Sequence, residues 1–398
     1  MDKIEELLAR GVEKIYPSRE ALEKVLRSGK KLRLYQGFDP SGPQLHIGHA
    51  VALRKLRQFQ ELGHKVIFLI GDFTGLIGDP AGKGSQRRRM TREEVLANAK
   101  DYQLQATKIL RFDGDNPVEI KFNSEWLAKL TFADVLDLAG HFTVQQMLER
   151  DMFQDRLKRK DDIGLHEFLY PLMQGYDSVA MEVDLELGGT DQTFNMLAGR
   201  KLVSQILHKE KFVMTVPLLT DAKGVKIGKT EGNVIGLTDP PNEFYGKIMS
   251  LGDEAIIPCF TLLSDVPLED IEEMKKKIKA GENPMVFKKR LAFELTRQFN
   301  SEDVARQAQG EFERVFQERQ VPGESTIAFE TKQIEWNPLD LLIATNLAAS
   351  KSEAKRLIEQ KAVELNNSLI TSHLSPLTLS DGAIIKVGKK KFLKINLL

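Results

Sequence analysis

Short apolar runs alternate with amphipathic segments over about the first 220 of the 398 residues. Residues 32–38 and 66–70 have the length and composition of strands, and the segment between them has an apolar face at helical spacing that ends at Gly63. That face consists of Leu53, Leu56, Phe59 and Leu62. This order predicts a βαβ unit, whose right-handed crossover makes the two strands parallel. We therefore predict an α/β protein with a Rossmann-like parallel sheet that binds ligands outside the carboxyl ends of its strands.

The pattern changes three times along the rest of the chain. Beyond residue 235 it is helical, and lysines cluster at 275–279 and 288–290, where phosphate contact and simple solvation are both possible. Pro322 and Gly323 lie in a segment of linker composition. The predicted parts are a Rossmann-like domain at 1–235, an α-helical domain at 236–317, a linker at 318–336 and a small α+β module at 337–398.

Two parts have additional local signals. Within the first domain, residues from about 122 to 165 predict a helical insertion, because apolar residues recur there at helical spacing. These residues are Phe132, Val135, Leu136 and Ala139. In the last module, residues 350–353 form a capping box before a helix, residues 362–366 read as a strand, and the final segment is basic.

The charge balance and the cysteine content restrict the kinds of protein to which this chain can belong. The 57 basic and 57 acidic side chains cancel, so any basic surface for nucleic acid must be local. The single cysteine, Cys259, excludes an intramolecular disulfide framework and a Cys-rich zinc site, and it fits a reducing compartment. No uncharged run approaches membrane-spanning length. We therefore expect a cytoplasmic protein.

The segment His46-Ile47-Gly48-His49 stands where the first predicted strand gives way to a helix. The N-terminus of a helix offers positive potential and backbone donors to phosphate groups. Gly48 permits close approach of a ligand to the backbone, and the two imidazoles supply further donors. A capped, solvated helix start would have the same residues, so this segment indicates a nucleotide site only together with a second motif.

That second motif lies in the glycine- and lysine-rich loop of residues 221–233. Lys226 and Lys229 are three residues apart in it, and Thr230 follows. Two such lysines could close over phosphates and stabilise the charge that develops on a pyrophosphate leaving group. A solvated turn is the alternative, but the presence of both motifs in this order favours catalysis.

The two motifs resemble the His-Ile-Gly-His and Lys-Met-Ser-Lys-Ser signatures of class I aminoacyl-tRNA synthetases. The first matches in full, whereas Ile227, Gly228 and Thr230 replace Met, Ser and Ser in the second. Both lysines of the second motif are present, and the Lys-x-Gly-Lys-Thr form occurs in tyrosyl enzymes. The chain therefore resembles bacterial-type tyrosyl-tRNA synthetases with a C-terminal S4 domain.

The segment 170–178 carries the residues expected to choose the amino acid. Tyr170, Gln174 and Asp177 would share one face of a helix that has Pro171 in its first turn. A buried carboxylate needs a donor, and a substrate phenol is suitable, although a capped helix whose acid faces water is the alternative. The resemblance implies that Asp177 reads the phenol and that Tyr170 and Gln174 hold the α-amino group.

The resemblance assigns further residues to the substrates. It implies that Tyr35 helps to bind the phenol, that Asp79 binds the α-amino group and that Gln192 completes the tyrosine site. An analogue without the hydroxyl would leave Asp177 and Tyr35 unpaired, so phenylalanine would be rejected. The implied ATP-binding residues are Asp39, His46, Gly48, His49, Gly189, Asp191, Lys226 and Lys229.

The implied reaction has two steps. The carboxylate of tyrosine attacks the α-phosphate of ATP and releases pyrophosphate, and a ribose hydroxyl of tRNA(Tyr) then takes the tyrosyl group. Positioning and charge stabilisation would provide most of the catalysis. Mg²⁺ would accompany ATP without a protein-bound metal cage. The implied catalytic residues are His46, His49, Lys226, Lys229 and Thr230.

The resemblance also implies three macromolecular contacts. The α-helical domain at 236–317 would bind the anticodon stem of tRNA, with simple solvation of its lysine clusters as the alternative. The C-terminal module would be an S4-like RNA-binding domain that grips structured RNA, with a soluble basic tail as the alternative. The helical insertion would form a homodimer contact, with a solvated helical face as the alternative. The implied RNA-binding residues are Lys351, Lys355, Arg356, Lys389, Lys390 and Lys391.

Two other functions remain open at this point. A tryptophanyl enzyme would keep both nucleotide motifs but would not need a carboxylate that reads a phenol. A catalytically silent RNA-binding regulator would keep the fold, but the intact histidines and lysines argue against it.

Overall fold

The computed structural model describes residues 2–40, 42–77, 90–220, 226, 234–317, 328–366, 368–388 and 391–397. The chain divides into two compact units, Met1–Ala305 and Arg306–Leu398. Among the described residues, no helix has the length and apolar character needed to cross a membrane.

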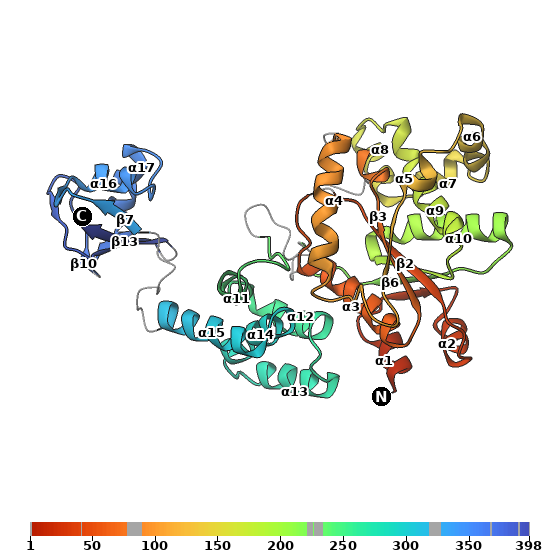
Figure 1. The fold of residues 1–398 in the computed structure, drawn as a ribbon, viewed down its shortest axis with the longest axis horizontal. Coiled ribbons are helices and arrows are strands. Elements are labelled where there is room, and N and C mark those ends of the chain that lie inside the picture. The colour runs from red at the N-terminus through yellow and green to blue at the C-terminus, as the bar shows by residue number, and fades with distance from the viewer. Residues whose placement is uncertain are drawn as a thin grey trace. The chain divides into compact units, whose positions relative to one another are not determined.

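The first unit is built on a six-stranded sheet (Figure 1). Its strands are β1 (Lys14–Tyr16), β2 (Arg33–Phe38), β3 (Lys65–Ile70), β4 (Glu119–Phe122), β5 (Leu185–Gly189) and β6 (Phe212–Val216). In the order β1-β6-β5-β2-β3-β4, all neighbours are parallel except β1, which pairs antiparallel with β6 at the edge. The predicted βαβ unit is confirmed as β2, α3 (Ile47–Glu61) and β3. The Rossmann-like parallel sheet is therefore confirmed.

Helices cover both faces of this sheet. Figure 1 shows α3 on one side of the central strands and α10 on the other. Because both faces are covered, β3 and β6 are almost continuously apolar and buried, as expected of central parallel strands. The helical segments up to β6 are α1 (Lys3–Ala9), α2 (Arg19–Arg27), α3, η1 (Thr74–Leu76), α4 (Arg92–Ala106), α5 (Ser124–Leu127), α6 (Phe132–Gly140), α7 (Val144–Leu148), α8 (Asp151–Arg159), η2 (Leu165–Phe168), α9 (Tyr170–Ala180), η3 (Thr190–Gln192) and α10 (Thr193–Leu207).

The region predicted as a helical insertion, at about 122–165, contains helices α5 to α8. Leu138 and Met147 turn inward and pack with Leu202 and other apolar residues of α9 and α10. Phe132 and Leu136, which contributed to the predicted pattern, are instead 78% and 58% exposed. The insertion therefore has one apolar side in the core and apolar residues on its outer surface.

The helices that follow β6 up to residue 305 belong to the same compact unit. One link between them and the N-terminus is Arg10, whose guanidinium donates to the backbone carbonyls at the end of α12. Most carbonyls in the last turn of a helix lack backbone partners within that helix, so Arg10 caps α12 from a distant part of the chain. The helical segments here are α11 (Pro241–Met249), η4 (Asp253–Ala255), α12 (Ile256–Leu263), α13 (Leu268–Lys279) and α14 (Pro284–Phe299). α15 (Glu302–Phe312) begins in this unit, whereas its later residues and the π-helical turn η5 (Glu313–Gln317) belong to the second unit.

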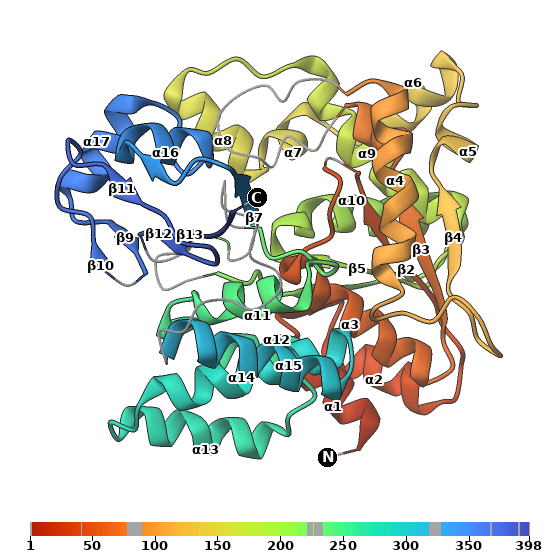
Figure 2. The same ribbon diagram turned by 60° about the vertical axis from the view of Figure 1, so that its left-hand side comes forward.

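The second unit is a small α+β fold with a core of its own. Its elements are β7 (Ala328–Thr331), β8 (Glu335–Trp336), α16 (Pro338–Ala344), α17 (Lys351–Glu359), β9 (Val363–Leu365), β10 (Ser368–Leu369), β11 (Leu377–Thr378), β12 (Ile384–Val387) and β13 (Lys391–Leu397). They form a five-stranded sheet in the order β10-β9-β12-β13-β7 and the pair β11-β8 (Figure 2). The predicted helix and strand appear as α17 and β9, and Ser350 caps α17 by accepting the backbone N–H of Glu353 at 3.2 Å.

The structure differs from the sequence interpretation at the start of this unit. The segment interpreted as a linker, 318–336, contains β7 and β8. β7 pairs in parallel with β13, and β8 pairs with β11. Both partners are at least 40 residues away in the sequence, so local composition could not reveal these pairings.

Candidate active site

The predicted substrate-binding residues that the structure describes gather around the carboxyl edge of the sheet, between β2 and β5. From β2 the chain proceeds outward to β3 and β4, and it then returns to β5 on the other side of β2. Such a reversal of strand order is the topological switch point at which α/β sheets bind ligands. Asp39 follows β2 directly, and Gly189 ends β5.

His46 and His49 cap the start of α3 reciprocally. Nδ1 of His46 accepts the backbone N–H of Gly48 at 3.1 Å, and Nδ1 of His49 accepts the backbone N–H of His46 at 3.1 Å. The two ring centroids are 3.9 Å apart. A neutral imidazole that accepts at Nδ1 carries its proton on Nε2. Both rings therefore have Nε2–H donors at a helix N-terminus, an arrangement suited to phosphate oxygens.

The segment after the lysine-rich loop pairs with the start of α3. The backbone N–H of Ile47 donates to the carbonyl of Ile235 at 3.0 Å, and that of Leu237 donates to Leu45 at 2.9 Å. One end of the loop is therefore anchored beside the two histidines. Lys229 and Thr230 lie outside the described residues.

Lys226 is the part of the second motif that the structure describes. Its Nζ lies 2.9 Å from Oδ2 of Asp191, just beyond β5, and both side chains are partly exposed. Gly189 leaves room beside them, because a Cβ there would lie 2.7 Å from Oδ1 of Asp191 and the carboxylate would have to shift. The structure thus brings together three of the predicted ATP-binding residues at the end of β5.

Asp39 is held from two sides. The hydroxyl of Tyr170 donates to its Oδ2 at 2.6 Å, and the hydroxyl of Thr74 donates to its Oδ1 at 2.7 Å. A Cβ at Gly71 would lie 2.0 Å from Oδ1 of Asp39, so a glycine is required there. The structure therefore joins a predicted ribose ligand and a predicted amino-group ligand through a direct hydrogen bond, and it adds Thr74, which sequence reasoning missed.

Asp177 lies on the predicted inward face of α9 and is 2% exposed. Nε1 of Trp126 donates to its Oδ1 at 2.7 Å, and Nδ2 of Asn123 lies 3.3 Å from its Oδ2. Burial raises the pKa of Asp177 well above its usual range, and these two donors oppose the rise. The confirmed helix and this burial exclude the alternative in which the acid faces water.

Tyr35 is fully buried on β2. Its hydroxyl lies 2.9 Å from Oγ of Ser178 and 3.4 Å from the backbone carbonyl of Gln174. Burial raises the pKa of this phenol well above its ordinary value, so it is a neutral hydrogen-bonding group. The predicted residues Tyr35 and Gln174 are thus in direct contact.

Gln174 and Gln192 share one donor that was not predicted. Nδ2 of Asn195 donates to Oε1 of Gln174 at 2.9 Å and to Oε1 of Gln192 at 3.0 Å. On its other side, Nε2 of Gln174 donates to Oε1 of Glu186 at 3.0 Å. Asn195 and Glu186 are buried, and neither belongs to a motif that would have singled it out.

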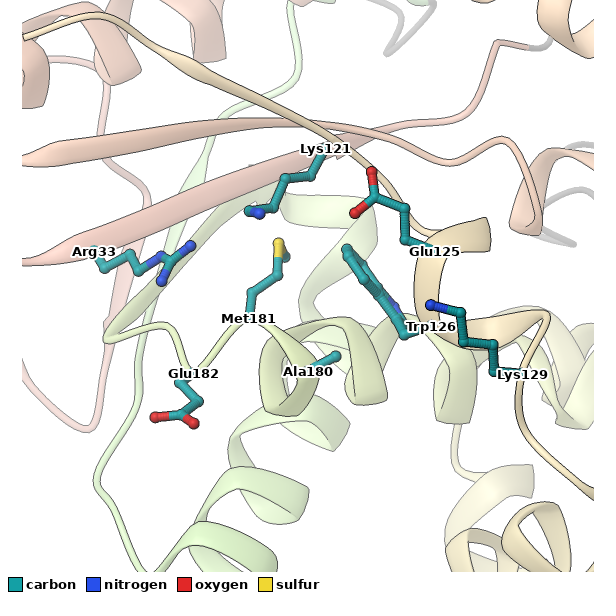
Figure 3. Close-up of a pocket in the computed structure, with 8 residues that line it drawn as sticks. All are labelled: Arg33, Lys121, Glu125, Trp126, Lys129, Ala180, Met181 and Glu182. Carbon is teal, nitrogen blue, oxygen red and sulfur yellow. The ribbon is translucent and has the colours of Figure 1, made fainter.

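A surface hollow of about 530 Å³ lies apart from the predicted residues. Figure 3 shows the side chains around it, with the indole of Trp126 among them. Its lining residues are Arg33, Lys121, Glu125, Trp126, Lys129, Ala180, Met181 and Glu182. None of the predicted substrate ligands lines it, although Trp126 also donates to Asp177.

The remaining predicted residues divide into two groups. Asp79, Lys389 and Lys390 lie outside the described residues, as does the side chain of Lys391. Lys351, Lys355 and Arg356 are exposed on α17, where Lys351 lies 2.8 Å from Asp340. Within the described ranges, no group of three or more His, Cys, Asp or Glu side chains could hold a metal ion.

Comparison with known proteins gives a consistent family. A family model described as tRNA synthetases class I (W and Y) matches residues 27–317. The tyrosine–tRNA ligase of Thermotoga maritima is 48% identical over 393 residues, which cover 98% of this chain and 96% of the relative. That of Moorella thermoacetica is 43% identical over 395 residues, which cover 98% and 95%. A C-terminally truncated mitochondrial tyrosyl-tRNA synthetase from Coccidioides posadasii has a TM-score of 0.62 at 25% identity, over 78% of this chain and 91% of that one.

Proposed function

The chain belongs to the class I tRNA synthetases of the W and Y family, and from this premise we propose that it is a tyrosine–tRNA ligase. It activates L-tyrosine with ATP to tyrosyl-adenylate and pyrophosphate, and it then transfers tyrosine to the 3′ end of tRNA(Tyr). The relatives that match over nearly its full length are tyrosine–tRNA ligases.

The observation that carries this specificity is the buried carboxylate of Asp177. A carboxylate without water is costly unless donors surround it, and Trp126 and Asn123 supply two. The phenol of tyrosine supplies a further donor, whereas phenylalanine supplies none and the indole of tryptophan differs in shape and donor position. Tyr35, fully buried on the adjacent strand, completes the site for the phenol.

The rest of the substrate shell holds the reacting groups. Asp79, Tyr170 and Gln174 bind the α-amino group of tyrosine, and Gln192 completes the shell. Asp39, Gly189 and Asp191 contact the ribose of ATP, while Gly48 lets the nucleotide approach the start of α3. This assignment is supported by the hydrogen bonds that join Asp39 to Tyr170 and Asn195 to both glutamines.

In the first step, a carboxylate oxygen of tyrosine forms a bond to the α-phosphorus of ATP as the bond to pyrophosphate breaks. His46 and His49 donate to the nucleotide phosphates, and Lys226, Lys229 and Thr230 close on the departing pyrophosphate. Before ATP arrives, Lys226 pairs with Asp191, so it must exchange this partner for phosphate. Mg²⁺ enters as part of the ATP complex, and no protein cage is required.

In the second step, a terminal ribose hydroxyl of tRNA(Tyr) attacks the tyrosyl carbonyl, AMP leaves, and the hydroxyl proton is lost to the leaving phosphate or to water. No protein nucleophile takes part in either step. The RNA is held by the C-terminal unit, which we propose to be an S4-like domain. Exposed Lys351, Lys355 and Arg356 on α17 support this role, and Lys389, Lys390 and Lys391 extend it.

A homodimer through the helical insertion is part of this proposal. Five large apolar side chains in the predicted range of the insertion are exposed, by 48% to 82%, and an exposed apolar surface is typical of an interface between protein chains. They are Phe132, Leu136, Val144, Leu157 and Leu165. Size-exclusion chromatography with light scattering should give a dimer for the wild type and a monomer for Phe132→Asp combined with Leu165→Asp.

The cytoplasm is the proposed location, because ATP, tyrosine and tRNA meet there and because the single cysteine fits a reducing compartment.

ATP–pyrophosphate exchange with tyrosine, tryptophan and phenylalanine tests the function directly. We expect exchange with tyrosine and only background with the other two. Preference for tryptophan would mean that the chain is a tryptophanyl enzyme of the same family. No exchange with any amino acid would instead support a silent RNA-binding regulator.

A further inference from the structure

We propose that Glu186 and Lys211 are positioning residues, which act through Asn195 to set the direction of the hydrogen bonds in the tyrosine shell. This inference rests on the proposed activation of tyrosine. None of the three residues is expected to touch a substrate, and none belongs to the nucleotide motifs.

Glu186 and Lys211 form an ion pair inside the first unit. Their side chains are 2% and 0% exposed, and Nζ of Lys211 contacts Oε2 of Glu186. The same Nζ donates to Oγ of Ser178 at 2.7 Å and to the carbonyl of Met196 at 3.3 Å. A Cβ at Gly199 would lie 2.6 Å from this Nζ, so a glycine makes room for the lysine. Burial lowers the pKa of Lys211, and the adjacent Glu186 carboxylate opposes the shift.

A chain of hydrogen bonds leads from this pair to the two glutamines of the substrate shell. The carboxylate of Glu186, which is paired with Nζ of Lys211, can only accept, so the atom of Gln174 that lies 3.0 Å from it must be Nε2. Oε1 of Gln174 then faces Asn195, whose atom at 2.9 Å must be Nδ2. The same Nδ2 lies 3.0 Å from Gln192, which must therefore present Oε1 to it. An amide is ambiguous by itself, but one carboxylate at the end of the chain orients all three.

The resulting orientations of the two glutamine amides are complementary to the ammonium and carboxylate groups of an α-amino acid. Oε1 of Gln174 has a second lone pair with which it can accept a hydrogen bond from the substrate ammonium group. Nε2 of Gln192 points away from Asn195 and can donate to the substrate carboxylate. If either amide were reversed, it would oppose the charge that it has to bind. The ion pair thus determines how both glutamines face tyrosine.

A second branch runs from the pair toward the phenol end of the site. Oγ of Ser178 lies 3.3 Å from Oε2 of Glu186 and 2.9 Å from the hydroxyl of Tyr35. Tyr35 and Glu186 are also direct neighbours in the register of β2 and β5. The pair therefore contacts groups that serve both ends of the substrate, which a pair acting only as part of the core need not do.

The test is steady-state ATP–pyrophosphate exchange by the full chain, with tyrosine and ATP varied separately. The main variant combines Glu186→Gln with Lys211→Met, which removes both charges at nearly constant volume and leaves no lone buried charge. Loss of one oriented hydrogen bond is expected to raise the KM for tyrosine about tenfold. The KM for ATP should stay within about twofold of the wild-type value, because the pair contacts no ATP ligand.

Lys55→Met is the matched control. Lys55 is a lysine of similar burial in the same unit, but the acceptors of its Nζ among the described residues are the backbone carbonyls of Leu7 and Arg10. We expect this variant to change the melting temperature without a selective change in the KM for tyrosine. An equal rise in that KM for the control would overturn the proposal, because loss of stability alone would then explain the effect.

Asn195→Ala keeps the proposal testable if the double variant does not fold. It removes only the shared donor, so it should also raise the KM for tyrosine selectively, and combining it with the double variant should add little. A folded variant of either kind with an unchanged KM for tyrosine would contradict the proposal. Absence of exchange by the wild-type chain would instead refute the proposed function, so the two failures can be told apart.

Discussion

Two regions of the molecule hold their polar groups in opposite ways. One is the substrate centre between β2 and β5, and the other is the cationic face of α17. In the centre, Asp177 is buried, and its carboxylate has partners about 50 residues away in the sequence, on α5 and at its N-cap. On α17, Lys355 is exposed, and the acid nearest to it is Glu359, one turn away on the same helix. The orientation of a buried polar group depends on residues that are distant in the sequence, whereas each surface cation makes its contribution independently of the others. Substitutions should therefore be coupled and selective in the centre, and additive on α17.

The largest expected effect concerns the loop that closes over ATP. Lys229→Ala should slow adenylate formation by about 10²- to 10³-fold, because the lysine acts on charge that develops in the transition state. Calorimetry should give an unchanged Kd for tyrosine. Lys209→Ala, which removes a surface lysine paired with Glu182, is the matched control and should retain full exchange. Normal adenylate formation by Lys229→Ala would remove the loop from the mechanism.

Removal of the second region altogether should separate the two steps. A chain that ends at residue 317 lacks the whole sheet of the C-terminal unit, including β7, and should lose aminoacylation of tRNA by about a hundredfold. Its exchange rate with tyrosine should stay within about twofold of wild type. A cut at residue 336 is less suitable, because it would leave β7 without its partner β13. Full aminoacylation by the shorter chain would require another role for this unit.

Asp177→Asn tests the centre through a change of one atom. The amide can still accept from Trp126, but the charge that favours a phenol donor is lost. We expect the KM for tyrosine to rise about 10- to 100-fold and that for ATP to change little. Kinetics with phenylalanine as a second substrate should show weaker discrimination. Unchanged discrimination in a folded variant would mean that Asp177 does not read the hydroxyl.

Substitutions of the exposed cations on α17 should have smaller and additive effects. Lys351→Ala, Lys355→Ala and Arg356→Ala should each weaken tRNA binding several-fold without any effect on exchange. Each substitution should also reduce the slope of log K against log salt concentration by about one, if each cation contacts one phosphate. Strong coupling among the three substitutions would show that α17 binds RNA as an organised site and that its cations do not act independently.

His64 should affect stability alone. Its Nδ1 accepts the backbone N–H of Leu32 at 3.0 Å, and burial lowers its pKa to about 4. Because the unfolded chain binds a proton near pH 6.5 and the folded chain only near pH 4, stability should fall as the pH drops between these values, by at most about 3 kcal/mol. Urea unfolding of His64→Gln should show a weaker dependence on pH in this range. An unchanged dependence would assign the acid sensitivity to other groups.

Local patterns predicted what depends on residues close in sequence. The spacing in α3 and α9 was enough to place His46 at a helix start and Asp177 on an inward face, and both placements are confirmed. Capping at Ser350 is equally local. Such features can be read from sequence because residues within two turns determine them.

Contacts across long sequence separations could not be predicted in this way. In the sequence, Glu186 looks like an ordinary strand residue. Its importance comes from two contacts in the folded chain, one with Lys211, 25 residues away, and one with Gln174 on another element. Arg10 caps a helix about 250 residues later in the chain. Only the folded chain brings these groups together, and this is also why the linker interpretation missed β7.

A crystal structure of the chain with bound tyrosine tests the central claim most directly. The account predicts the amino acid at the carboxyl edge between β2 and β5, with its phenol oxygen about 3 Å from a carboxylate oxygen of Asp177 and its ammonium group on Gln174. Tyrosine bound in the hollow beside Lys121 and Lys129, or bound with its ring turned away from Asp177, would contradict it.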